Sequence, residues 1–180
     1  TSNHVLHGIT NAGNFNNAGR ISPEWEGGGF ITNLESGTFS NTGTIRANGA
    51  DIRNEGDFYN SGSIRMVDET YGYCTDPGDI DTCGSWDVYA GGIYSSGNGN
   101  FQNSGTVYSE SSVYATDGGR IDNYGAITAR RVYVNAYDAT AGGGSFVNRS
   151  TGTIAAETSV YNGGRLTNSG RINGEVIVSG

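Results

Sequence analysis

The chain has 180 residues, a formal net charge of −8 and a pI of about 4.5, so it lacks the basic surface that nucleic-acid binding requires. It contains 31 Gly, only three Leu and no Lys, and this composition disfavours helices. No apolar run approaches the roughly 20 residues that span a bilayer, so we expect no membrane insertion. Regularly spaced Ile, Val, Phe and Tyr indicate an ordered, all-β chain.

The first repeated segment is ITNAGNFNNAGRI, residues 9–21, and similar segments follow at residues 31–45 and 52–64. Ile, Asn, Gly and Phe occupy every second position of the first segment. Alternate side chains of an extended chain point the same way, so these residues share one face. One copy is too short to bury that face, and we therefore expect successive copies to stack on one another.

The pattern returns after residue 92 in the segments IYSSGNGNFQNSGTV, VYATDGGRIDNYGAI, SFVNRSTGTI and VYNGGRLTNSGRI. The spacing stays at about twenty residues for each repeat. This periodicity predicts a single-stranded right-handed parallel β-helix, a solenoid with coils of about 20 residues and about three short strands in each coil. We expect one domain over residues 1–180 with about eight or nine coils.

Repeated asparagines mark the corners of the predicted coils. Asn tolerates left-handed backbone conformations, and its side chain can hydrogen-bond backbone groups. Stacked asparagines would satisfy the polar groups that a corner exposes, while Gly permits the turn itself. We expect structural roles for Asn11, Asn17, Asn33, Asn41, Asn54, Asn60, Asn103, Asn123, Asn148 and Asn168.

Residues 65–92 interrupt the repeat and predict a loop-bearing insertion between coils. Cys74 and Cys83 enclose an Asp-rich segment with a Pro-Gly turn, and a local disulfide is their simplest use, which would indicate an oxidising compartment. Two free thiols in a cytosolic protein are the alternative. The pattern requires no cofactor, although a calcium ion could bind in this loop. The candidate calcium ligands are Asp76, Asp79 and Asp81.

Aromatic residues gather in two places. Those of the insertion suit sugar stacking or protein contact, or else pack the loop onto the rod; they are Tyr71, Tyr73, Trp86 and Tyr89. A second set follows inward Ile or Val residues and predicts a column on the outer face of the later coils. It consists of Tyr94, Tyr114, Tyr133 and Tyr161. Such a column could stabilise the sheet or form a strip for lateral association or glycan binding.

The segments FSNTGTI, FYNSGSI, FQNSGTV and LTNSGRI resemble the repeats of bacterial secreted β-helix proteins. These are the haemagglutinin-like exoproteins of two-partner secretion and the passenger domains of autotransporters. The resemblance covers most of the chain apart from residues 65–92. It implies an extracellular, cell-surface protein without enzymatic activity: a fibre subunit or adhesin stalk that mediates surface contact, adhesion or matrix assembly.

Two other functions stay open, and the ends of the chain suggest a partner. A glycan-binding module would use the aromatic residues of the insertion and outer face. A polysaccharide-cleaving β-helix enzyme is less favoured, because the chain has no Lys to serve as a base. The segments HVLHGIT and NGEVIVSG show no cap for the strand edges. We therefore expect end-to-end self-association or continuation of a longer β-helix, with a glycan or cell-surface receptor as a further partner.

Overall fold

The computed structural model describes residues 8–22, 30–74, 83–137, 140 and 142–179. A few residues within strands are described by their backbone alone, namely Phe30, Tyr71, Tyr73, Cys74, Cys83 and Trp86. All regular secondary structure in the described ranges is β-strand. The all-β prediction is therefore confirmed.

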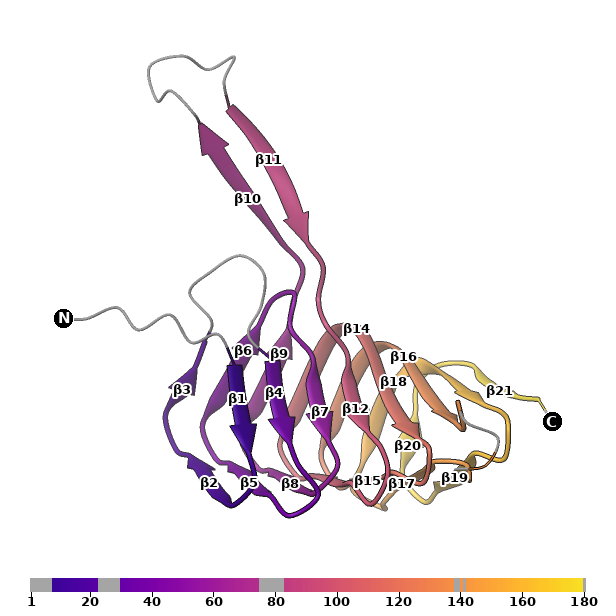
Figure 1. Cartoon of the computed structure of the whole chain (residues 1–180). Helices are drawn as coiled ribbons and strands as arrows, with labels where there is room; N and C mark the ends of the chain where they lie inside the picture. Colours follow the sequence, from indigo (N-terminus) through magenta and orange to yellow (C-terminus); the bar gives the residue numbers. More distant parts are fainter. Residues whose placement is uncertain (1–7, 23–29, 75–82, 138–139, 141, 180) are drawn as a thin grey trace.

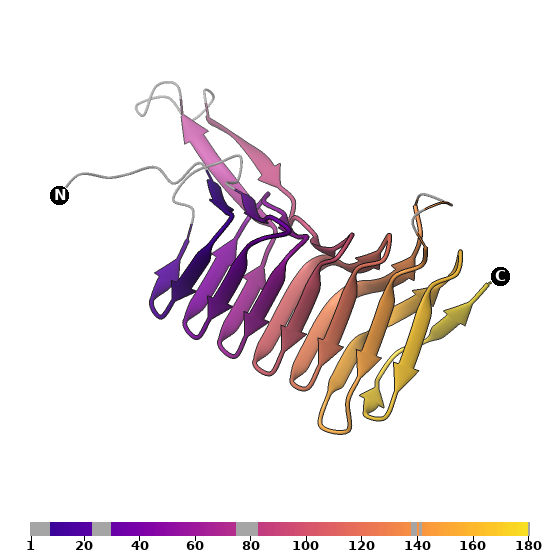
Figure 2. The same ribbon diagram turned by 60° about the horizontal axis from the view of Figure 1, so that its bottom comes forward.

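Parallel strands coil into a solenoid with three faces, and the first and last described strands lie at opposite ends of the stack (Figures 1 and 2). The first face contains β1 (Gly8–Asn11), β4 (Phe30–Asn33), β7 (Ile52–Asn54), β12 (Ile93–Ser95), the later parts of β14 (Thr106–Thr116), β16 (Ala126–Asn135) and β18 (Thr153–Val160), and β21 (Val176–Val178). The parallel β-helix prediction is confirmed.

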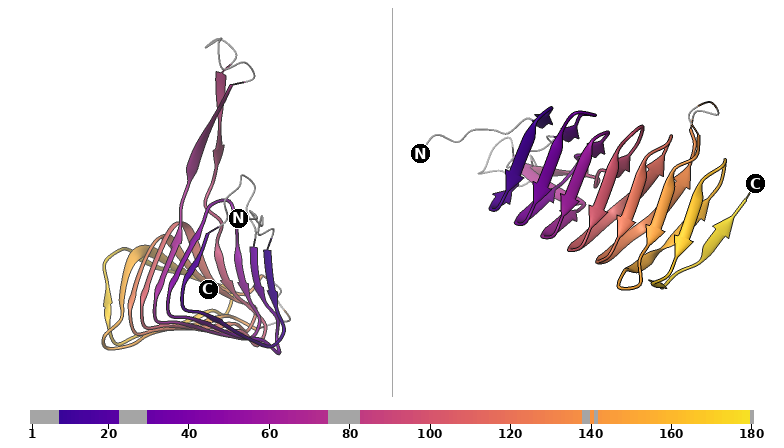
Figure 3. Two further views of the ribbon diagram at one scale, coloured as in Figure 1. Left: turned by 90° about the vertical axis from the view of Figure 1, so that its left-hand side faces the viewer. Right: turned by 90° about the horizontal axis from the view of Figure 1, so that it is seen from below.

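The second face is a separate sheet, and the third face joins the first. The second face contains β2 (Asn14–Asn17), β5 (Thr38–Asn41), β8 (Asp57–Asn60), β13 (Asn100–Asn103), β15 (Arg120–Asn123), β17 (Ser145–Asn148) and β19 (Arg165–Asn168). The third contains β3 (Arg20–Ile21), β6 (Thr44–Ala47), β9 (Ser63–Met66), the earlier parts of β14, β16 and β18, and β20 (Arg171–Ile172). Viewed along its axis, the solenoid has a roughly triangular outline (Figure 3).

The number of coils is smaller than the spacing predicted. The second face holds seven strands in the described part of the chain, and β21 begins a further coil by pairing with β18. The expectation of eight or nine coils was wrong because it counted residues 65–92 toward the stack. In the structure much of this segment leaves the solenoid.

The insertion is a β-hairpin that projects from the solenoid (Figures 1 and 3). Its strands β10 (Glu69–Cys74) and β11 (Cys83–Val88) are antiparallel and pair with each other. The insertion begins later than predicted, because residues 65 and 66 belong to β9. The backbone register places Cys74 opposite Cys83 and Tyr71 opposite Trp86.

Apolar side chains of equivalent positions form columns inside the solenoid. On the second face the rings of Phe15, Phe39, Phe58 and Phe101 stack with centroids 4.7, 4.6 and 5.1 Å apart. The column continues through Ile121, Phe146 and Leu166 in register. Because every coil repeats the same apolar positions, each buries its inward face against its neighbours.

An unbroken asparagine ladder runs beside the phenylalanine column. Each side-chain amide donates to the amide oxygen of the equivalent Asn in the next coil, at 2.7 to 2.9 Å. Its members are Asn17, Asn41, Asn60, Asn103, Asn123, Asn148 and Asn168. Most of them are fully buried. Several of the amides also donate to backbone carbonyls, as Asn41 does to Ser63, so the ladder fixes the corner of the coil.

A second, shorter ladder connects the first three coils. Asn11 donates to Asn33 at 2.8 Å, and Asn33 donates to Asn54 at 2.8 Å. The next position along this column is Ser95, whose hydroxyl lies 2.9 Å from the carbonyl oxygens of both Gly99 and Arg120 and shares its one proton between them. The buried Nδ2 atom of Asn54 consequently has no hydrogen-bond partner.

Glycines of the repeated Asn-x-Gly motif allow the coils to approach closely. A Cβ atom at Gly62 would overlap the carbonyl oxygen of Gly43, and one at Gly105 would overlap the carbonyl oxygen of Gly62. The same conflict with Gly105 arises at Gly125. The repeated motif therefore combines a ladder residue with a residue that has no side chain at the contact between coils.

Candidate binding face beside the projecting hairpin

Three of the predicted tyrosines form a stacked strip on the outside of the first face. Tyr94, Tyr114 and Tyr133 are in register on β12, β14 and β16. The Tyr94 and Tyr114 rings lie 4.4 Å apart at 3°, and the Tyr114 and Tyr133 rings lie 5.1 Å apart at 18°. All three side chains are half-buried. We call this set the tyrosine strip.

Tyr161 is not part of this column, contrary to the prediction. The backbone partner of Tyr133 on β18 is Ser159, and the Tyr161 ring meets Tyr133 edge-on at 6.3 Å. In the sequence Val160 precedes Tyr161 as Val132 precedes Tyr133, but in the structure the register pairs Val132 with Thr158. Tyr137 joins the cluster instead, with its ring 6.5 Å from that of Tyr114.

The environment of Tyr94 disfavours its ionised form. Burial raises the pKa of Tyr94 to about 12, and the neighbouring Tyr114 and Asp51 add to this effect. Space for the ring depends on Gly92, because a Cβ atom there would overlap it. Tyr94 therefore offers a neutral phenol at physiological pH.

A groove of about 290 Å³ lies where the hairpin leaves the solenoid. Its walls come from the foot of the hairpin, from β14 and from the region of β16 that includes Tyr133. The lining residues are Asp68, Tyr89, Ala90, Glu110, Ser111, Ser112, Arg130, Arg131 and Tyr133. The groove thus brings together two residues that the sequence predicted for binding, Tyr89 and Tyr133, which lie 44 positions apart in the printed sequence.

Irregularities in two neighbouring strands create this groove. The register between β14 and β16 shifts between Ser109 and Ser112, and the register between β16 and β18 shifts between Thr128 and Arg131. A β-bulge interrupts side-chain alternation and redirects side chains. Polar residues such as Glu110 and Arg130 are thereby placed at the surface where the third face passes into the first.

The acidic residues of the groove are hydrogen-bonded to the hairpin foot. Glu110 Oε2 accepts the backbone N–H of Asp68 at 2.6 Å, and Asp68 Oδ1 accepts the backbone N–H of Ala90 at 2.5 Å. Tyr108 donates to Glu110 Oε1 at 3.0 Å, and this bond raises the pKa of Tyr108. These contacts fix both carboxylates beside the groove.

The two arginines differ in their contacts. Arg131 donates to the Tyr133 hydroxyl at 3.1 Å and pairs with Glu157 at 3.3 Å. Arg130 is exposed, and within the described part of the chain it forms no ion pair or hydrogen bond through its side chain. Its guanidinium N–H groups are available to a ligand.

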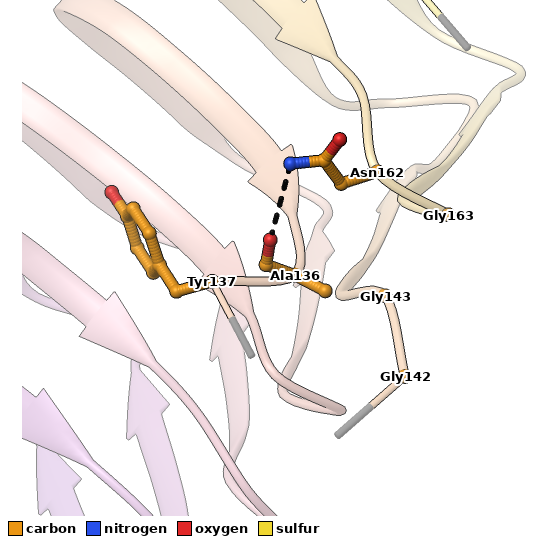
Figure 4. Close-up of a pocket in the computed structure, with 6 residues that line it drawn as sticks. All are labelled: Ala136, Tyr137, Gly142, Gly143, Asn162 and Gly163. Carbon is orange, nitrogen blue, oxygen red and sulfur yellow. Dashed lines mark hydrogen bonds between the residues drawn. The ribbon is translucent and has the colours of Figure 1, made fainter. Parts of the chain in front are cut away.

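A larger pocket of about 450 Å³ presents fewer polar side chains to a ligand than the groove does (Figure 4). Glycines form much of its wall, and Asn162 donates to the backbone carbonyl of Ala136 at 3.4 Å. Among the described residues that line it, Tyr137 and Asn162 have polar side chains and none is charged. We therefore favour the groove as the functional site.

Other predicted site residues lie in or beyond the hairpin. Tyr71, Tyr73 and Trp86 belong to its strands, but their side chains are outside the structural description. Asp76, Asp79 and Asp81 lie outside the described residues altogether. Elsewhere, among the described residues, no three His, Cys, Asp or Glu side chains gather as a metal site would require.

The sequence interpretation missed the charged residues of the groove. Asp68, Glu110, Arg130 and Arg131 come from three separate segments, and only the bulges and the hairpin bring them together. The polar run SESS at residues 109–112 was a signal, because it places extra residues between two inward apolar positions. This polar run did not predict which residues from other segments would lie beside it in the fold.

The architecture defines this molecule as a parallel β-solenoid bearing one projecting hairpin. Comparison with protein-family models, curated proteins and solved structures found no match. No helix capable of crossing a bilayer occurs in the part of the chain that the structure describes.

Proposed function

We propose that this chain is a non-enzymatic structural segment of an extracellular fibre or adhesin stalk. The observation that carries the proposal is the asparagine ladder, which continues through seven strands of the second face together with the apolar column. In a solenoid each coil contacts only its neighbours. A continuous buried ladder couples those neighbours along the whole axis and so favours a stiff rod.

Surface localisation and adhesion can be tested on the cells that make this protein. Antibodies against the 180-residue chain should label unpermeabilised cells, and deletion of the coding region should reduce attachment to surfaces or to other cells. Labelling that requires permeabilisation would overturn the extracellular assignment. Normal attachment after deletion would overturn the adhesive role, while leaving the fold unaffected.

We also propose a disulfide between Cys74 and Cys83. The antiparallel register supports it, because the two residues face each other as backbone partners near the tip of the hairpin. The bond would contribute about 2 to 3 kcal/mol at most by restricting the unfolded hairpin. Intact-mass measurement with and without reductant tests it: two free thiols in protein purified without reductant would contradict the proposal.

We further propose that another coil stacks on the C-terminal end of the described rod, supplied by a longer chain or by a second copy. The support is the exposure of apolar side chains on β21, where Val176, Ile177 and Val178 are 44%, 41% and 74% exposed. Such residues favour association. Light scattering of the 180-residue chain should show concentration-dependent growth if copies stack, and a monomer at every concentration would exclude self-stacking.

A further inference from the structure

The groove at the hairpin foot presents the mixture of groups that suits a polyhydroxylated ligand. Asp68 and Glu110 supply carboxylate acceptors with lone pairs beyond those already used. Arg130 supplies unengaged N–H donors. A sugar hydroxyl donates one hydrogen bond and accepts others, so it can bridge a carboxylate and a guanidinium within one small groove.

Aromatic rings provide the apolar side of the same site. Tyr89 is 71% exposed at the groove, and the half-buried Tyr133 lines the groove from strand β16 of the solenoid. Aromatic rings with a polar end suit surfaces that bind partly apolar, partly hydrated ligands. The C–H face of a sugar ring is such a surface.

The charge balance of the groove selects an uncharged ligand. Asp68 and Glu110 offset Arg130 and Arg131, and Glu157 further neutralises Arg131. The whole chain carries a formal charge of −8, which disfavours approach of a polyanion. An acidic polysaccharide would therefore gain no net attraction from the balanced groove and would meet like charge over the molecule.

We propose that this groove binds an uncharged saccharide. Arg130 donates to its hydroxyls, Asp68 and Glu110 accept from them, and the exposed ring of Tyr89 contacts its C–H face. Tyr133 contacts the saccharide with its ring edge, because stacking on Tyr114 covers one of its faces. Tyr133 also belongs to the tyrosine strip. A longer saccharide extends from the groove along the outer edges of the Tyr114 and Tyr94 rings, whose faces are stacked on each other, so affinity increases with chain length. Binding at this site does not depend on the proposed fibre role.

The test is a glycan array of neutral and acidic saccharides, followed by calorimetric titration of the best neutral binder. We expect Arg130→Ala and Tyr89→Ala each to weaken binding by about tenfold or more, because a charged hydrogen-bond donor and an exposed ring contact are lost. Arg165→Ala and Tyr59→Ala are matched controls, since both residues are exposed on the second face. They should leave the affinity unchanged.

Three results would overturn the proposal. They are no binding to any neutral saccharide on the array, selective binding of acidic saccharides, and binding that both groove variants leave intact. Thermal unfolding of each variant shows whether it is folded. Because Tyr89 and Arg130 are exposed, their truncation should leave the midpoint close to that of the parent.

Discussion

The side-chain amide of Asn60 donates a 2.8 Å hydrogen bond to Asn103, although the two residues are 43 positions apart. The hairpin β10–β11 lies between them in the chain. The strands β8 and β13 that carry them pair in parallel and in register. The hairpin therefore leaves and re-enters the solenoid without interrupting either the ladder or the phenylalanine column.

Removing one ladder residue should destabilise the solenoid. Asn103→Ala removes the acceptor of Asn60 and the donor to Asn123 and to the carbonyl of Ala126. We expect the free energy of unfolding to fall by about 1 to 3 kcal/mol, because buried polar partners lose their hydrogen bonds. Urea denaturation measures this change. Gln102→Ala is the control, since that amide side chain is only half-buried on the same strand and should cost no more than about 0.5 kcal/mol. Equal losses would contradict a special role for the ladder.

A methyl group at a coil contact should be more damaging than one at an open glycine. In Gly62→Ala the new Cβ would overlap the carbonyl of Gly43, whereas at Gly19 no atom lies within 4 Å of the added Cβ. We expect Gly62→Ala to lower the free energy of unfolding by about 2 to 4 kcal/mol, and Gly19→Ala to leave it nearly unchanged or slightly raised. Thermal unfolding of the two variants compares them directly. Similar thermal unfolding midpoints for the two variants would show that neighbouring coils can move apart to accommodate the added methyl group at little cost.

Alkaline pH should destabilise the tyrosine strip. The pKa of Tyr94 is raised from 10.0 to about 12 by burial and by neighbouring groups, so the unfolded chain releases this proton first. Stability from this group is therefore present below about pH 10 and is lost as the pH rises toward about 12. Tyrosinate absorbance, compared between the parent and Tyr94→Phe, should reveal one phenol that titrates near the upper value. A difference curve centred near the ordinary tyrosine pKa would refute this assignment.

Acid should weaken an ion-pair cluster on the second face. Asp122 is 4% exposed; burial opposes its ionisation, but hydrogen bonds from Arg120 and Arg149 outweigh burial and lower its pKa. Its contribution is present above the unfolded pKa of about 3.9 and is lost as the pH falls through the lower folded value.

The measurement for this cluster is the free energy of unfolding at about pH 5 and about pH 2. Asp122→Asn should be less stable than the parent at the higher pH, by about 1 to 3 kcal/mol, and should lose less on acidification. Glu175→Gln changes an exposed carboxylate that forms no ion pair in the described residues, and it should follow the parent. An unchanged acid dependence in Asp122→Asn would show that other groups control acid unfolding.

The repeat predicted the solenoid because its spacing, inward residues and corner asparagines agree from coil to coil. Phe39, Phe58 and Phe101 illustrate this agreement, since they are equivalent in both sequence and structure. The pattern failed where a polar residue occupies an inward position. Thr158 is fully buried in the column of Val113 and Val132, and its polarity caused the misplacement of Tyr161.

The groove could not be predicted in the same way. Its charged residues belong to no repeated motif of the sequence. They meet because two strands carry irregularities at one level and because a hairpin leaves the solenoid beside them. The periodicity of a sequence predicts only the features that all coils have in common. A site formed by residues that depart from the repeat can be recognised only once the pairing of the strands is known.

All six hydrogen bonds of the long asparagine ladder run in one direction, from each coil to the one after it. Each amide is a dipole of about 3.5 D, close to that of a peptide unit, and parallel dipoles in a line add. The ladder by itself is therefore an electric dipole, with its positive end at the C-terminal coil and its negative end at the N-terminal coil. Backbone N–H groups at the same corners point the opposite way, as that of Ser61 does in donating to the carbonyl of Asn41. The side-chain and backbone amides of this corner therefore oppose each other's dipoles along the axis of the rod.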